Sequence, residues 1–208
     1  MFLNINFGRL AVKVLFFCFL ISLFSCSQLI YGVPDVKKAS VVGTFYPYDK
    51  DELQKTIKAF LDEVPEDNQI LNATIWGLVV PHAGYDYSGK VAAHAYKQIR
   101  YKNYKTVIIL GTSHYSHFSG TVIYPRGKWE TPLGIIQVDT NVASKIQKTA
   151  TFLKTYTNPF IPEHSIETQL PFLQMSLGNF KIVPILFGQK VKDEEYKAIA
   201  STLSTLIK

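Results

Sequence analysis

Residues 106–114, with the sequence TVIILGTSH, are an apolar run that ends in a glycine, two hydroxyl residues and His114. Such a run is typical of a strand covered on both faces in a parallel sheet. Residues 77–85 (GLVVPHAGY) repeat this arrangement, with His82 just after a second apolar run. Ligands of open α/β sheets bind beyond the carboxyl ends of the strands. The two stretches therefore predict a parallel sheet with two imidazoles at its ligand-binding end.

The spacing of the two histidines fits a shared metal site. His82 and His114 are 32 positions apart, the size of a strand–helix–strand crossover. If the crossover joins neighbouring strands, their ends lie roughly 5–10 Å apart, because strands are spaced by about 4.8 Å. Gly84 and Gly111 permit close backbone approach in both loops. Two imidazoles could then bind one iron, copper or zinc ion; alternatively, each histidine only bonds a loop carbonyl.

The rest of the chain alternates between helical and strand patterns. Helices are predicted at residues 49–64, 88–100 (capped by Ser88), 141–149, 163–177 (kinked at Pro171) and 193–207, and strands at 75–80, 107–110, 121–124, 135–138 and 180–187. Residues 125–134 are predicted to be a loop. This alternation predicts an α/β fold with a mainly parallel central sheet, helices on both faces, and some antiparallel strands between residues 120 and 140.

Residues 1–33 have the pattern of a targeting segment. Arg9 and Lys13 precede the apolar residues 14–24, a length typical of signal peptides and short for a membrane-spanning helix of about 20 residues. A retained anchor is possible if the polar residues that follow are tolerated. Residues 23–26 (LFSC) resemble a bacterial lipobox, which would lipidate Cys26, although Phe24 departs from that pattern. We expect export to the periplasm or a membrane anchor, and membrane contact only through this segment.

A linker at residues 34–41 and a domain at residues 42–208 are expected to follow. Hydrophobic residues make up 47% of the chain, so a folded core is expected. The net charge is +6, but the lysines are dispersed, which argues against a nucleic-acid partner. Both cysteines, Cys18 and Cys26, lie in the targeting segment, so the domain has no disulfide or thiolate ligand. Because no glycine-rich phosphate loop, nucleophile elbow, HExxH or CxxC is present, we expect no nucleotide cofactor.

Further candidates accompany the two histidines. Glu163, His164 and His117 could each supply a third ligand or orient a metal-bound histidine. Glu167, one helical turn from Glu163, could likewise orient a metal-bound histidine; alternatively, the two glutamates only compensate a helix dipole. Aromatic residues crowd the same loops and could line a pocket for a planar ligand, or simply form the edge of the core: Tyr46, Tyr85, Tyr87, Tyr115 and Trp129.

In their order, the motifs of this chain resemble those of the Memo family, also described as the AmmeMemoRadiSam system protein B family. The resemblance covers about residues 41–208 and rests on the stretches 43–47 (GTFYP), 81–89 (PHAGYDYSG), 92–96 (AAHAY), 110–114 (LGTSH), 129–134 (WETPLG), 163–167 (EHSIE) and 183–186 (VPIL). It implies a fold related to class III, non-haem iron extradiol dioxygenases.

The resemblance also implies that His82 and His114 line a metal-binding pocket. The family's third metal-site residue is a cysteine far toward the C-terminus, beyond a Ser-Asp motif, and this sequence has neither. Thr112 stands where proline is commoner in the family. Family members are longer than the matching part of this chain, so a C-terminally truncated version of the fold is expected.

Two functions follow from these observations. The first is a metal-binding protein with an iron or copper site and, if it is an enzyme, dioxygenase-like chemistry on a small molecule. The second is a non-catalytic module that binds a peptide or small ligand in the same aromatic cleft. An incomplete gene product without a folded site is a third interpretation.

Overall fold

The computed structural model describes residues 35–66 and 74–206. The predicted signal peptide, the lipobox cysteine and the possible anchor fall on residues 1–33, outside the described residues. None of the helices in the two described ranges is long and apolar enough to cross a membrane.

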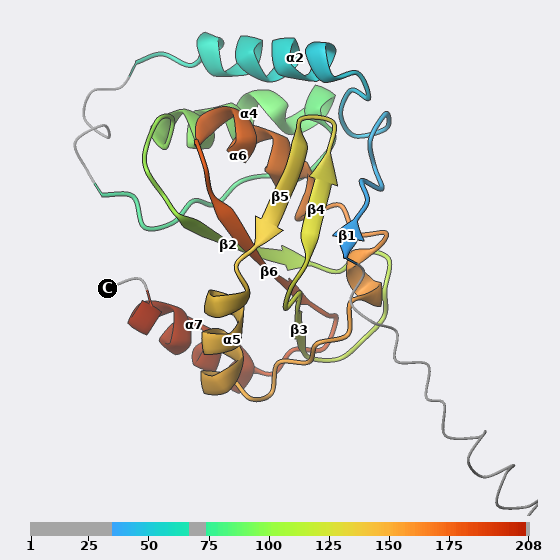
Figure 1. The fold of residues 1–208 in the computed structure, drawn as a ribbon, viewed down its shortest axis with the longest axis vertical. Coiled ribbons are helices and arrows are strands. Elements are labelled where there is room, and N and C mark those ends of the chain that lie inside the picture. Colours follow the sequence, from blue (N-terminus) through green and yellow to red (C-terminus); the bar gives the residue numbers. More distant parts are fainter. Residues whose placement is uncertain (1–34, 67–73, 207–208) are drawn as a thin grey trace, which may run out of the picture. The chain divides into compact units, whose positions relative to one another are not determined.

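Six strands form one mixed sheet in the order β1-β4-β5-β6-β2, and β3 pairs with β6 beside this path (Figure 1). The strands are β1 (Val36–Lys37), β2 (Thr106–Thr112), β3 (Thr121–Ile123), β4 (Lys128–Thr131), β5 (Gly134–Val138) and β6 (Lys181–Phe187). The pairs β2–β6, β5–β6 and β1–β4 are parallel, whereas β4–β5 and β3–β6 are antiparallel. The predicted mainly parallel α/β sheet is therefore confirmed, including antiparallel strands between residues 120 and 140.

Helices cover both faces of this sheet, as predicted. The helices α2 (Lys50–Glu63), α4 (Tyr85–Gln98) and α6 (Leu170–Ser176) lie together on one face, and α5 (Thr140–Thr149) and α7 (Asp193–Leu206) lie on the other. Two short 3-10 helices, η1 (Asn158–Phe160) and η2 (Glu167–Gln169), precede α6. The strand β6 serves both layers, because its side chains alternate: Ile182 and Leu186 pack in the first core, and Val183 and Ile185 in the second.

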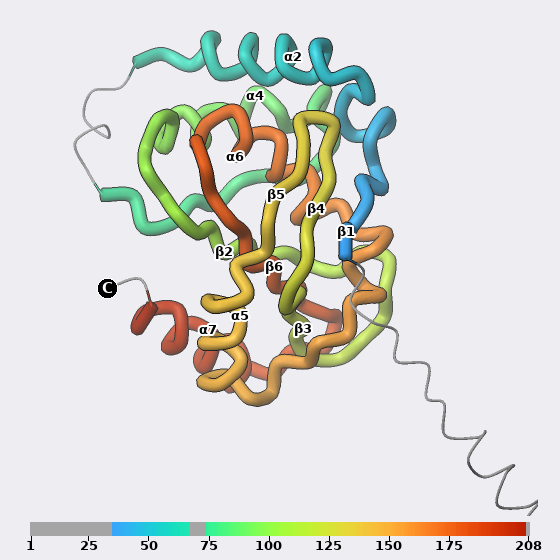
Figure 2. The backbone as a smooth tube through the Cα atoms, in the orientation of Figure 1, coloured from blue at the N-terminus to red at the C-terminus, as the bar shows by residue number. Residues whose placement is uncertain are grey.

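The predicted strand at residues 75–80 is not a strand in the structure. The run passes into α4 without a sheet partner and can be followed as the blue-green tube in Figure 2. Trp76 and Val79 are largely exposed, while Leu78 and Val80 are half-buried. Among the residues that the structure describes, the neighbouring strand β2 pairs on one side only, with β6. The near-continuous apolar run predicted a strand, and this prediction is wrong, because pairing depends on a neighbouring strand that the described residues do not supply.

The expected linker at residues 34–41 contributes to the fold. Val36 and Lys37 form β1, which pairs with β4, a strand that the sequence pattern had assigned to a loop. Lys37 and Val41 are buried. The polar composition of this segment suggested a linker, but Lys37 has a buried carboxylate partner 130 positions later in the chain, Glu167.

Two predicted helix starts are also corrected. The helix α4 begins at Tyr85 with Gly84 as its N-cap, and the Ser88 hydroxyl instead donates to the carbonyl of Ala83 at 3.0 Å. The helix predicted from residue 163 begins only at η2 and α6, with Pro171 in the first turn of α6. A proline there needs no N–H partner, so it starts the helix rather than kinking it.

Candidate metal centre

Three histidines meet beyond the carboxyl end of β2. His114 follows this strand, His82 precedes α4, and His164 lies in the turn before η2. The ring centroids of His82 and His114 are 5.2 Å apart, and His164 lies 4.3 Å from His114 and 5.7 Å from His82. One ring nitrogen from each histidine lies within 4.8 Å of the other two. These three residues could therefore hold a metal ion.

Glu163 positions His114 through hydrogen bonds to its backbone and ring. Its buried carboxylate accepts a hydrogen bond from the backbone N–H of His114 at 2.7 Å and lies 2.9 Å from Nδ1 of the same ring. It also accepts the N–H groups of His164 and Ser165 at 2.9 and 2.8 Å. When Nδ1 donates to this carboxylate, the lone pair of Nε2 is left available for a ligand. The structure thus places Glu163 as the partner of a histidine, with its oxygens already engaged.

Gly111 permits the close approach of this turn to β2. A Cβ atom at position 111 would lie 2.6 Å from both Ile166 Cγ1 and Ser165 Oγ. The Ser165 hydroxyl donates to the carbonyl of Thr112 at 3.0 Å, which ties the turn to the end of the strand. The glycine in the sequence TVIILGTSH is therefore a requirement of the site's geometry.

The loop that carries His82 is held from two sides. Gln169 donates from Nε2 to the carbonyl of Pro81 at 3.3 Å, and its own carbonyl oxygen accepts the Tyr96 hydroxyl at 2.7 Å. On the other side, the N–H of Tyr85 donates to the carbonyl of Phe45 at 2.7 Å. His82 is consequently positioned by segments that are distant in sequence.

The electrostatics of the cluster favour neutral rings at His82 and His164 and an ionised carboxylate at Glu163. Burial, together with His114, lowers the pKa of His82. Burial also lowers the pKa of His164, against the opposing effect of Glu163. Burial alone would raise the pKa of Glu163, but hydrogen bonds from His114 and Ser165 outweigh it, and the pKa is lowered. Neutral histidines are the form that binds metals.

One buried atom of the cluster is unsatisfied. Nδ1 of His164 is buried without a hydrogen-bond partner, and it lies 3.6 Å from the nearest Glu163 oxygen. Buried polar nitrogens are normally paired, so an unpaired one in a group of potential ligands needs an explanation. This observation fits a group of metal-binding side chains.

Of the remaining predicted site residues, Tyr115 borders the cluster and the others lie outside it. His117 is exposed and lies outside the three-histidine cluster. Among the aromatic residues, Tyr115 borders the cluster, with its ring 5.6 Å from that of His164. Tyr46, Tyr85 and Trp129 are buried in the core, and Tyr87 is exposed on α4.

Glu167, the other glutamate expected as a possible partner of a metal-bound histidine, has a different role, and the ring of Phe45 was missed by the site prediction. Glu167 accepts hydrogen bonds from the hydroxyl of Tyr46 at 2.8 Å, the N–H of Val41 at 3.0 Å, Ser40 and Lys37. These hydrogen bonds hold the segment that contains Phe45. The ring centroid of Phe45 lies 4.6 Å from that of His164. No signal in the sequence connects Lys37 with Glu167, although the stretch GTFYP marks the Phe45 segment.

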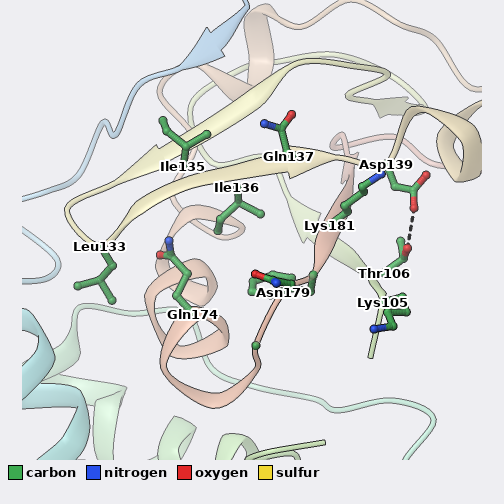
Figure 3. A pocket seen from close by; sticks show the side chains of 12 residues that line it. Lys105, Thr106, Leu133, Ile135, Ile136, Gln137, Asp139, Gln174, Asn179 and Lys181 are labelled. Carbon is green, nitrogen blue, oxygen red and sulfur yellow. Dashed lines mark hydrogen bonds between the residues drawn. The ribbon is translucent and has the colours of Figure 1, made fainter. Parts of the chain in front are cut away.

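Another pocket, of about 720 Å³, lies at the opposite end of the parallel strands (Figure 3). Thr106 and Lys181, the first residues of β2 and β6, are among its lining residues. The carboxylate of Asp139 accepts the Thr106 hydroxyl at 2.6 Å and the N–H of Val142 at 3.1 Å, which caps α5. The carboxylate of Asp139 thus serves the fold, and the histidine cluster remains the candidate site.

Comparisons with known proteins identify a family for this chain. The family model of the Memo-like proteins matches residues 37–208. A MEMO1 family protein of Thermoplasma acidophilum is 35% identical over 158 residues, which cover 76% of this chain and 58% of the relative. A MEMO1 family protein of Methanobrevibacter smithii is 39% identical over 163 residues, covering 74% of this chain and 58% of the relative.

A third relative, from Thermotoga petrophila, is a MEMO1 family protein that is 38% identical over 72% of this chain and 57% of its own length. The chain thus spans less than three fifths of the length of these relatives. The matched region includes all three histidines and Glu163. On the evidence of the family model and these relatives, the chain belongs to the Memo family.

Proposed function

We propose that His82, His114 and His164 bind a divalent metal ion, and that Glu163 orients His114 for this purpose. The observation that carries the proposal is the convergence of three ring nitrogens within 4.8 Å of one another. A set of imidazole ligands without thiolate suits iron, copper and zinc better than magnesium or calcium. Iron or copper is the identity that we propose, following the resemblance to non-haem iron dioxygenases.

Each residue of the cluster has a distinct task in this proposal. His82 and His164 have lowered pKa values and so present neutral rings at pH 7. Glu163 holds the proton of His114 on Nδ1 and directs Nε2 toward the other two rings. The ring of Phe45 packs beside His164 and limits its movement.

We further propose that any catalysis is of the non-haem dioxygenase type. When bound by three protein ligands, a metal ion would act as a Lewis acid and keep open coordination positions. The chain would contribute a partly exposed entrance, because the side chain of His114 is 37% exposed and Tyr115 is 52% exposed. A small molecule could approach the three histidines from this side.

Metal analysis of the purified full chain tests the binding proposal. The wild type should retain close to one equivalent of iron, copper or zinc after dialysis. His82→Ala, His114→Ala and His164→Ala should each lower the affinity by at least about tenfold. His94→Ala and His117→Ala are matched controls, because both histidines are exposed and outside the cluster. Equal metal content in all six proteins would refute the site.

Oxygen uptake separates catalysis from plain binding. The metal-loaded chain should consume oxygen in the presence of a catechol, and the His114→Ala variant should not. A loaded chain without uptake would instead favour the second function, a non-catalytic module that binds a peptide or small ligand. Burial of Tyr46, Tyr85 and Trp129 leaves that module fewer aromatic contacts than the sequence led us to expect.

A further inference from the structure

The pocket of about 720 Å³ at the start of β2 and β6 shares no lining residue with the histidine cluster (Figure 3). Its volume is within the range of small-molecule sites, which is about 300–1,000 Å³. Three parts of the chain enclose it: the starts of β2 and β6, the hairpin of β4 and β5, and the end of α6 with the turn that follows. The pocket is therefore a second place at which the fold could hold a small molecule.

The walls of this pocket are joined by the side chain of Gln174. The strand β5 pairs with β6 only through its last two residues, so the rest of the hairpin extends beyond the first residue of β6. Gln174 of α6 reaches this hairpin: its Nε2 donates to the carbonyl of Gly134 at 3.3 Å, and its Oε1 accepts the Thr131 hydroxyl at 2.6 Å. The hairpin is thus fixed to α6, with the pocket between it and the starts of β2 and β6.

The two ends of the pocket differ in chemistry. Leu133 and Ile136 of the hairpin, together with Phe180, line it with apolar side chains that pack with the first core. Lys105 and Lys181 lie at the end away from Leu133, side by side on the two strand starts, where the N–H of Lys181 donates to the carbonyl of Lys105 at 3.0 Å (Figure 3). A ligand that matches both ends has an apolar body and a polar head.

The polar end of the pocket has one positive charge in excess. Asp139 is the only carboxylate among the lining residues, and its two oxygens already accept the Thr106 hydroxyl and the N–H of Val142. Burial would raise its pKa, but hydrogen bonds from Thr106 and Val142 and the charge of Lys181 outweigh it, and the pKa is lowered. Among the described residues, no carboxylate lies within 4.0 Å of the ammonium group of Lys105 or Lys181. A ligand with one negative charge would balance the two lysines and one aspartate.

We propose that this pocket binds a small organic monoanion, a carboxylate with an apolar chain. Its head group would lie beside Lys105 and Lys181, and its chain would lie against Leu133 and Ile136. Salt screens the attraction of exposed lysines for the head group, whereas burial of the chain does not depend on charge, so both ends contribute to recognition. The proposal is independent of whether the histidines bind metal.

Titration of the full chain with octanoate, after treatment with a chelator, tests the proposal through amide chemical shifts. Octanoate should shift the signals of residues 105–106, 133–139 and 178–181 and leave those of His82, His114 and His164 unchanged. Octanamide has the same chain without the charge, and acetate has the charge without the chain. Each should bind at least about tenfold more weakly than octanoate, because each lacks the contacts of one end.

Two lysine variants and a matched control make the test specific to this pocket. Lys105→Gln and Lys181→Gln alter exposed side chains, so the fold should be retained, and each should weaken octanoate binding at least about fivefold. Lys148→Gln is the control, because Lys148 is an exposed lysine of α5 that does not line the pocket. The proposal is wrong if octanoate does not bind, if octanamide binds as tightly, or if Lys148→Gln weakens binding as much. It is also wrong if the same signals shift with protein concentration alone, which would make a second copy of the chain the occupant.

Discussion

Glu163 and Glu167 are both completely buried and lie four positions apart, yet they organise two different regions. Glu167 pairs with the buried ammonium of Lys37 and accepts further hydrogen bonds from Ser40, Val41 and Tyr46. These hydrogen-bond partners come from the first strand and the loop after it. Glu163 instead engages Nδ1 of His114, whose side chain remains 37% exposed.

The difference separates a structural region from one able to bind a ligand. In the Lys37–Glu167 region, opposite charges neutralise each other inside the core and leave nothing for a ligand to contact. In the His114–Glu163 region, the carboxylate satisfies one nitrogen of the ring and leaves the other unused. A buried carboxylate beside an imidazole therefore leaves one ring nitrogen free to bind a ligand. A buried carboxylate beside an ammonium forms an ion pair in which both charges are neutralised.

Removal of Glu167 should have the largest effect on the protein. Glu167→Ala leaves the Lys37 ammonium buried and unpaired, which should lower the free energy of unfolding by about 3–5 kcal/mol. Urea unfolding of the full chain, followed by far-ultraviolet circular dichroism, measures this loss. The double variant Lys37→Met with Glu167→Gln should recover a large part of it, because no charge then remains buried. A double variant as unstable as the single one would contradict the ion-pair interpretation.

Removal of Glu163 should act on metal binding more than on folding. Glu163→Gln keeps the size of the side chain but weakens the partner of His114, so metal affinity should fall about 10- to 100-fold. Competition with a chromophoric chelator measures the affinity, and urea unfolding of the metal-free protein measures stability. If Glu167→Gln weakened metal binding as much as Glu163→Gln, the two carboxylates would not have separate roles.

The smallest expected effect is the loss of the stability that Glu167 contributes when the protein is acidified. Burial would raise the pKa of Glu167, but Lys37, Ser40 and Val41 outweigh it, so its pKa is below the ordinary value of 4.5. The carboxylate therefore contributes stability that is complete above pH 4.5 and is lost as pH falls through the folded-state pKa. In metal-free protein, the stability of the wild type should fall more steeply than that of Glu167→Gln below pH 4.5. Parallel curves for the two proteins would exclude this contribution.

Much of the fold was accessible from sequence because its patterns are local. The helix at residues 50–63 follows its apolar spacing and its cap, with Asp49 accepting the N–H groups of Asp51 and Glu52 at 3.0 and 2.9 Å. Strands at residues 106–112 and 181–187 agree with their continuous apolar runs. The closing helix at residues 193–206 was predicted to within one residue of its end.

The site could be predicted only in part from the sequence, for a related reason. The positions of His82 and His114 after apolar runs indicated that they would meet, and the structure brings their rings to 5.2 Å. The roles of Glu163 and His164 could not be separated, because adjacent residues in a turn point in directions that only the folded backbone defines. Aromatic residues were equally ambiguous, since Trp129 belongs to the core and Tyr115 to the cluster.

Local sequence patterns were therefore sufficient to predict the α/β class and the end of the sheet at which two histidines lie. The neighbours of each element follow only from the folded chain. Lys37 pairs with Glu167 across 130 positions, β1 pairs with β4, and residues 75–80 have no strand partner among the described residues. These outcomes differ because periodicity indicates which face of a segment avoids water, whereas a pairing depends on groups that lie far away in the chain.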